Sequence, residues 1–194
     1  MIEEMRERLT RLIYERAFKY SEKPVFKLVS GALSNYYFNC KTVTLSPEGM
    51  YLIGHIIFDM ISHLNVRGIG GLTLGADPIS NAVAYTSYLK GKPLEAFTVR
   101  KKAKEHGTMQ WIEGNINSGD SVVVVDDVIT TGSSTIQAIT RLKEVGVLVR
   151  KVVVLVDRQE GGRENILKFL GECGFPQELE AVVTRQEVMA IHKS

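Results

Sequence analysis

Apolar and polar positions alternate at helical spacing in the first third of the chain. An amphipathic N-terminal helix is predicted by the apolar residues Ile2, Met5, Leu9, Leu12, Ile13 and Ala17. A second helix is predicted from about residue 47 to 64, because Ser46 suits an N-cap, Pro47 suits the first turn, and a broad apolar face follows.

Beyond residue 65 the pattern changes to short β-branched runs separated by longer helical stretches. The runs predict strands over 66–72, 94–99, 121–125, 150–156 and 179–183. The stretches predict helices over about 78–89, 133–145 and 162–169, and a last helical turn after Arg185. Because such runs, apolar on both faces, are typical of buried parallel strands, we predict one α/β domain over residues 1–194, with a mostly parallel central sheet flanked by helices.

One segment, 101–119, does not fit this alternation. It begins with cationic residues and contains several glycine and asparagine breakers. Loops of that length inside a compact domain are usually functional or disordered. We therefore expect a mobile loop there that could serve as a lid over a site.

Composition excludes several classes of protein. The 24 Lys and Arg residues nearly balance 22 Asp and Glu, and a net charge of +2 argues against a nucleic-acid partner held by phosphate neutralisation. The apolar runs are too short to span a bilayer, and the N-terminus lacks the apolar region of a secretory signal, so we expect a cytoplasmic protein with no membrane partner. Cys40 and Cys173 are expected to be reduced, inert thiols.

The segment 122–135 carries the most chemical information. A predicted buried strand ends in Asp126 and Asp127, and a turn rich in glycine, serine and threonine leads into a helix. Free N–H groups at the helix start, beside several hydroxyls, form a cradle for a phosphate. Two carboxylates would repel a phosphate, so their expected partners are ribose hydroxyls or hydrated Mg²⁺. The segment predicts a sugar-phosphate site, and the structural alternative is an ordinary capped helix.

This segment resembles the phosphoribosyl-pyrophosphate (PRPP) motif of the type I phosphoribosyltransferases. Four other segments resemble one subfamily, the orotate phosphoribosyltransferases: 26–39, 70–79 (its pyrophosphate loop), 100–107 (its mobile catalytic loop) and 155–160. The resemblance implies a glycosyltransferase that moves the 5-phosphoribosyl group from PRPP to orotate in UMP biosynthesis, with Mg²⁺ as cofactor. It also implies a homodimer whose catalytic loop is shared between subunits. Residues 1–45 would form a helix and a base-side hood, and 46–194 the α/β core.

The site residues that the resemblance implies fall into three groups. The catalytic group would supply positive charge that offsets the negative charge growing on the pyrophosphate leaving group, and it contains Arg100, Lys101, Lys104 and His106. PRPP would be bound by these four together with Asp126, Asp127, Val128, Ile129, Thr130, Thr131, Gly132, Ser133 and Ser134. Orotate would contact Thr130, Arg158, Tyr37 and Phe38, with Arg158 suited to a carboxylate. Mg²⁺ would be held through PRPP and water, without a direct protein ligand.

Several alternatives stay open at this stage. The cations of 100–107 could form a solvated loop, Arg158 could pair with Glu160 on the surface, and the two aromatic residues could pack in the core. Asp77 could reach Mg²⁺ through water or cap a helix. Some family members carry a lysine where this chain has Val29 or Gly75, so no lysine contact is carried over. The chain could also act on another base or be a PRPP-sensing regulator.

Overall fold

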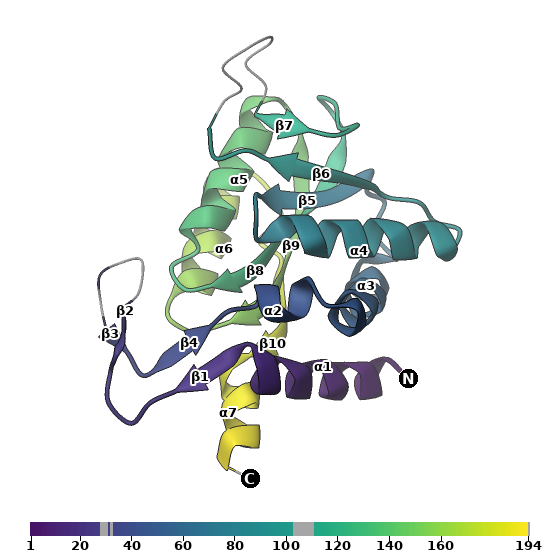
Figure 1. Cartoon of the computed structure of the whole chain (residues 1–194). Coiled ribbons are helices and arrows are strands. Elements are labelled where there is room, and N and C mark those ends of the chain that lie inside the picture. Colours follow the sequence, from purple (N-terminus) through teal and green to yellow (C-terminus); the bar gives the residue numbers. More distant parts are fainter. Residues whose placement is uncertain (28–30, 32, 103–110, 194) are drawn as a thin grey trace.

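A six-stranded sheet forms the centre of the fold in this computed structural model, which describes residues 1–27, 31, 33–102 and 111–193 (Figure 1). Its strands are β5 (Gly68–Leu72), β6 (Glu95–Val99), β7 (Ile112–Glu113), β8 (Ser121–Ile129), β9 (Leu148–Asp157) and β10 (Leu179–Thr184). They lie in the order β10-β9-β8-β5-β6-β7. β7 runs antiparallel to β6, and the other neighbouring pairs are parallel. The predicted α/β class with a mostly parallel sheet is confirmed.

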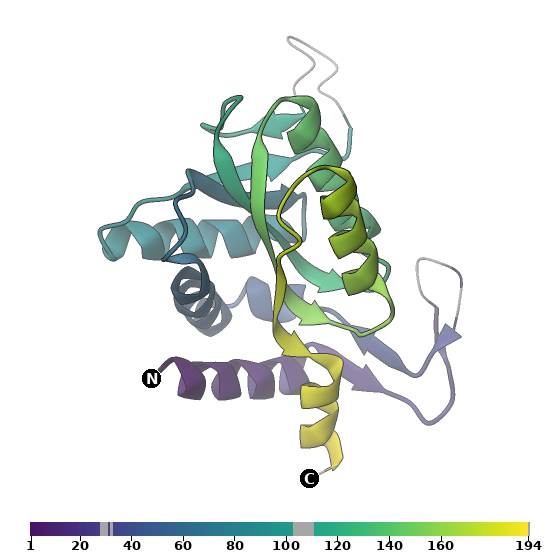
Figure 2. The ribbon, with the colours of Figure 1, turned by 180° about the vertical axis from the view of Figure 1, so that it is seen from behind.

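Helices cover both faces of this sheet (Figures 1 and 2). One face carries α5 (Ser133–Glu144) and α6 (Gly162–Glu172), and the other carries α3 (Pro47–Ile61) and α4 (Ala76–Leu89). α1 (Ile2–Arg16) packs against α3, and the C-terminal α7 (Arg185–Lys193) packs against α1. The chain ends therefore lie on the same side of the molecule.

The valine run of β8, residues 122–125, is buried on both faces of the sheet. Val123 and Val125 pack in the core that α1 and α3 cover, whereas Val122 and Val124 pack in the core under α5 and α6. Because successive side chains point to opposite faces, a strand buried on both sides needs an unbroken apolar run. The central strand of the sheet is thus fixed by burial rather than by alternation.

The N-terminal region adds small elements outside the main sheet. β1 (Phe18–Tyr20) pairs antiparallel with β4 (Tyr36–Phe38), β2 (Phe26–Lys27) pairs with β3 (Leu33–Ser34), and the one-turn helix α2 (Lys41–Thr44) follows. The pattern of apolar residues did not predict these strands or α2. The division of the chain into a hood over 1–45 and a core over 46–194 stays a prediction.

Several predicted boundaries were wrong. The second helix ends at Ile61, and α7 is a full helix rather than one turn. The segment 101–119 contains β7, so it is not entirely a loop. β8 continues past the two aspartates to Ile129, and both carboxylates have partners: Asp126 accepts from Thr135, and Asp127 accepts from the N–H of Val128. No helix in the described part of the chain is long and apolar enough to cross a membrane.

Candidate active site

A cavity of about 320 Å³ opens where the order of the sheet reverses. From β5 the chain moves outward to β6, then returns to β8 on the other side of β5 and continues to β9 and β10. Open α/β sheets bind ligands at such a switch point, outside the carboxyl ends of the strands. The cavity is lined by the loop after β5 (72–75), the end of β8 and the turn that follows it (126–134), Lys41 and Lys101.

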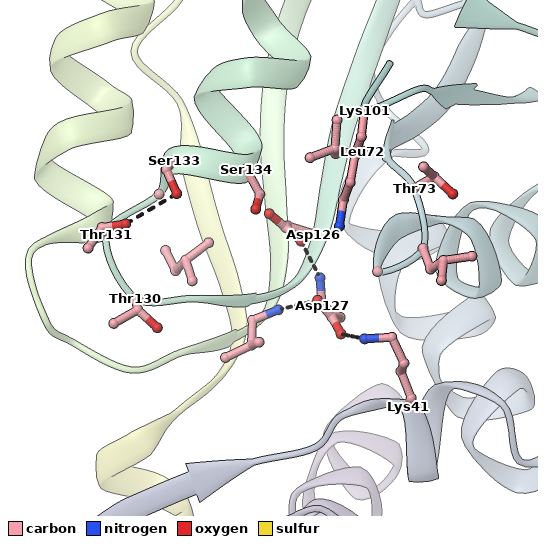
Figure 3. Close-up of a pocket in the computed structure, with 15 residues that line it drawn as sticks. Lys41, Leu72, Thr73, Lys101, Asp126, Asp127, Thr130, Thr131, Ser133 and Ser134 are labelled. Atoms are coloured by element: carbon pink, nitrogen blue, oxygen red, sulfur yellow. Dashed lines mark hydrogen bonds and ion pairs between the residues drawn. The ribbon is translucent and has the colours of Figure 1, made fainter. Parts of the chain in front are cut away.

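Asp126 and Asp127 lie side by side at the floor of this cavity (Figure 3). Asp126 is 5% exposed, and it accepts hydrogen bonds from the hydroxyl of Thr135 at 2.7 Å and from the backbone N–H of Asp127 at 3.0 Å. Burial and, as the second cause, the nearby Asp127 together raise the pKa of the Asp126 carboxyl to about 7, although the hydrogen bond from Thr135 lowers it. The first aspartate therefore changes its charge near neutral pH.

The turn after β8 is held rigidly for a phosphate. Gly132 has φ +80°, and a Cβ there would lie 2.7 Å from a side-chain carbon of Ile166 and 2.9 Å from the carbonyl of Gly162. Only glycine fits this position, for both reasons. Asn165 donates to the carbonyl of Thr131 at 3.0 Å. The turn thus delivers the free N–H groups at the start of α5 to the cavity, as an anion site requires.

The loop after β5 faces this turn across the cavity. Asp77 accepts hydrogen bonds from the hydroxyls of Thr73 at 2.7 Å and Thr98 at 2.8 Å. The helix begins at Ala76, one residue before this aspartate, so the N-cap role for Asp77 was wrong. Both of its carboxylate oxygens are engaged in fixing the loop. The Thr73–Leu74 peptide in this loop is cis.

Two of the four predicted cations, Arg100 and Lys101, lie among the residues that the structure describes. Lys101 lines the cavity, whereas Arg100 pairs with Glu113 at 3.1 Å and is not among the lining residues. Lys104 and His106 lie outside the described residues. The structure adds Lys41, whose Nζ lies 3.5 Å from Asp127 Oδ2. The sequence carried no signal for it, because α2 is one turn long and shows no periodicity.

Of the residues predicted for the base, Thr130 lines the cavity and Arg158 lies at the adjoining strand end. The N–H of Arg158 donates to the carbonyl of Ile129 at 3.1 Å, which brings Thr130 and Arg158 together at adjoining strand ends. The Arg158 guanidinium pairs with Glu160 at 2.9 Å, but it is buried, so this is not the surface ion pair of the alternative, and it also donates to Ser34 Oγ at 3.1 Å. Its Nε is buried without a hydrogen-bond partner.

The two predicted aromatic contacts differ in environment. Phe38 is 6% exposed and packs against Phe18, with ring centroids 5.1 Å apart, so it belongs to the core. Tyr37 is 40% exposed and stacks on Phe26. Neither lines the cavity. Phe38 therefore follows the core-packing alternative, and we do not retain it as a wall for the base.

The fold and the switch-point cavity define a type I phosphoribosyltransferase. A family model described as the phosphoribosyl transferase domain matches residues 68–170. The chain is 49% identical to the orotate phosphoribosyltransferase of Aquifex aeolicus over 163 residues, which is 84% of this chain and 89% of that relative. The chain therefore belongs to the orotate phosphoribosyltransferase family.

Solved structures show the same architecture. Orotate phosphoribosyltransferase of Mycobacterium tuberculosis in complex with Fe(III) dicitrate superposes with a TM-score of 0.79 at 32% identity, covering 95% of this chain and 98% of that one. The same enzyme in complex with PRPP gives a TM-score of 0.73 at 28% identity, covering 95% and 92% of the two chains.

Proposed function

We propose that this protein transfers the 5-phosphoribosyl group of PRPP to orotate, giving orotidine 5′-phosphate and pyrophosphate in UMP biosynthesis. The observation that carries the proposal is the cavity at the switch point of the sheet, in a chain of this family. Asp126 and Asp127 form its floor, and the turn that leads into α5 offers N–H groups suited to a phosphate. In the reaction a ring nitrogen of orotate bonds to C1′ of the ribose as the bond to pyrophosphate breaks. Negative charge therefore grows on the leaving group.

Each wall of the cavity suits one part of PRPP. The turn Thr130–Ser134 with the start of α5 suits the 5′-phosphate, because its N–H groups are free and its backbone is fixed by α6. Asp126 and Asp127 suit the ribose hydroxyls, since a carboxylate accepts two or more hydrogen bonds. The loop after β5 then faces the pyrophosphoryl group. Such a fixed polar environment lowers the barrier without reorganising during reaction.

Mg²⁺ fits this cavity as a partner of the substrate. The hard carboxylate oxygens of Asp126 and Asp127 border the cavity, and Mg²⁺ prefers oxygen ligands and retains water. Within the residues that the structure describes, no three His, Cys, Asp or Glu side chains gather as a metal cage. We therefore propose that PRPP and water supply most of its ligands. When bound, Mg²⁺ would offset charge on the pyrophosphoryl oxygens.

Recognition of orotate is assigned mainly to Arg158. Its guanidinium lies at the strand end that adjoins Thr130, and a planar guanidinium is the group that binds a planar carboxylate such as that of orotate. Thr130, at the adjoining strand end, offers a hydroxyl to the same ligand. Lys104 and His106 are proposed, from the family motif alone, to act on the leaving group, together with Arg100 and Lys101.

The proposal also includes a homodimer with shared sites. The exposed apolar residues Leu45, Met50 and Leu74 line one groove beside Lys41, adjoining the cavity, and Tyr85 and Tyr88 are exposed on α4. Exposed apolar surface of this kind marks interaction sites. If the loop of one subunit acts in its partner's site, mixing inactive Lys104→Ala and Asp127→Asn subunits should restore about a quarter of wild-type activity through half-active heterodimers. No gain on mixing would contradict loop sharing.

The direct test of function is Mg²⁺-dependent loss of orotate absorbance in the presence of PRPP. Orotate should be consumed in step with pyrophosphate release. Consumption of another base but not of orotate would replace the proposal with a phosphoribosyltransferase of different specificity. PRPP binding without turnover of any base, together with tight and salt-dependent nucleic-acid binding, would favour the regulator.

A further inference from the structure

Two lysines approach the acid pair from opposite sides of the cavity (Figure 3). Lys101 belongs to the segment that resembles the family's catalytic loop. Lys41 comes from α2 in the N-terminal region, outside every motif that the sequence comparison with the family singled out. In the described part of the chain, these are the only cationic side chains that line the cavity.

The Lys41 ammonium lies beside Asp127 at the edge of the cavity. It lies 3.5 Å from Asp127 Oδ2, and its side chain is 47% exposed while that of Asp127 is 11% exposed. The ammonium therefore has one protein partner on its inner side and an open side toward the cavity. Lys41 and Leu74 also line the adjoining groove, so this lysine stands directly beside the loop.

A side chain at position 75 would require the carboxylate of Asp127 to move. A Cβ built on Gly75 would lie 2.5 Å from Asp127 Oδ1 and 3.3 Å from Asp126 Oδ1. Some family members place a lysine at this position, and here the carboxylates occupy the space that its first carbon would need. Because residue 75 is glycine here, a cation serving the same part of the cavity comes from another element, and Lys41 lies there.

We propose that Lys41 binds the pyrophosphoryl group of PRPP, supplying from α2 the positive charge that some relatives supply from the loop after β5. The inference rests on the proposed function, since it names a residue for the same substrate. Without the anion, Lys41 offsets the charge of Asp127. With the anion present, the ammonium has a second, more highly charged partner within the cavity, and its exposed side is free to take it.

The test compares Lys41→Met, Lys41→Arg and the wild type, with Lys90→Met as the matched control. Lys90 is an exposed lysine directly after the far end of α4. Lys41→Met should raise both the KM for PRPP and the inhibition constant of pyrophosphate about tenfold, with the KM for orotate changed less than twofold. Lys41→Arg should recover most of the affinity because it keeps the charge, and Lys90→Met should match the wild type.

Equal rises in the KM values of PRPP and orotate would overturn the inference, because a purely structural ion pair would disturb both substrates. Unchanged pyrophosphate inhibition in Lys41→Met would overturn it as well. Failure of the proposed function would show separately, as a wild-type protein that does not consume orotate. If Lys41→Met is unstable, the pyrophosphate inhibition of Lys41→Gln against Lys41→Arg gives the same comparison of neutral and charged side chains.

Discussion

The hydrogen bond from Thr135 to Asp126 lowers the pKa of a carboxyl that lines the cavity. Thr135 is 1% exposed, and its hydroxyl donates to Asp126 Oδ2 at 2.7 Å. Burial and Asp127 hold the pKa of Asp126 at about 7 while this hydrogen bond lowers it. Replacing Thr135 with valine keeps the shape and removes the donor. The carboxylate then loses a partner that favours its charged form.

The magnitude follows from the energy of one charge-assisted hydrogen bond. A hydrogen bond to a charged group contributes about 1.5–3 kcal/mol, and about 1.4 kcal/mol corresponds to one pKa unit. Thr135→Val should therefore raise the pKa of Asp126 by about one to two units. If ionised Asp126 accepts the ribose hydroxyls, the acidic limb of kcat/KM for PRPP should move from near neutrality to higher pH by the same amount.

The assay is kcat/KM for PRPP measured between about pH 5 and 9.5. Thr140→Val is the matched control, because Thr140 lies on the same helix and its hydroxyl donates to the Ile136 carbonyl at 2.8 Å, away from the acid pair. The control should keep the wild-type acidic limb. An acidic limb that stays in place in Thr135→Val, with normal folding, would refute the assignment of this limb to Asp126.

Three further substitutions, the first with a matched control, test residues in and around the cavity. Gly132→Ala should lower the free energy of unfolding by about 3 kcal/mol in urea denaturation, from its positive φ and its contact with Ile166. Gly119→Ala should cost about 1 kcal/mol, since it shares the positive φ but meets nothing within 4 Å; equal costs would contradict the packing argument. Asp77→Asn should raise the KM for PRPP about tenfold in initial-rate kinetics, because it weakens the hydrogen bonds that fix the loop after β5. Arg158→Leu should abolish orotate turnover while PRPP binding, followed by calorimetry, persists; unchanged orotate kinetics would contradict its role.

The parts of the site that could be predicted from sequence are those formed by residues close together along the chain. The valine run of β8 and the following Gly132–Ser134 turn lie within fourteen or so residues of one another, and each has its own conformational signature. The predicted strand and helix start were confirmed, and the structure adds that Gly132 between them is left-handed. By contrast, the strands of the N-terminal region are two or three residues long. They are defined by pairing across the chain, which leaves no periodicity to detect.

Lys41 and Asp77 could not be predicted for the same reason. Their partners are Asp127 and the hydroxyl of Thr98, which are distant along the chain and meet them only when the strands assemble. A one-turn helix and an aspartate before a proline each fit several local structures. The sequence could locate the acid pair but could not show which residues restrain it.

The acid pair was expected at the end of a strand, and its place inside β8 links stability to function. A carboxyl with a raised pKa binds its proton more tightly in the folded than in the unfolded state. The contribution of Asp126 to stability is therefore fully present below its unfolded pKa of about 3.8 and is lost as the pH rises through about 7. The ionised form proposed to receive the ribose is thus also the less stable form of the fold. A ligand that binds only the folded state and donates hydroxyls to this carboxylate compensates for its desolvation. Burial of Asp126 consequently lowers the stability of the ligand-free protein at neutral pH, and a bound ligand that donates to Asp126 restores part of that stability.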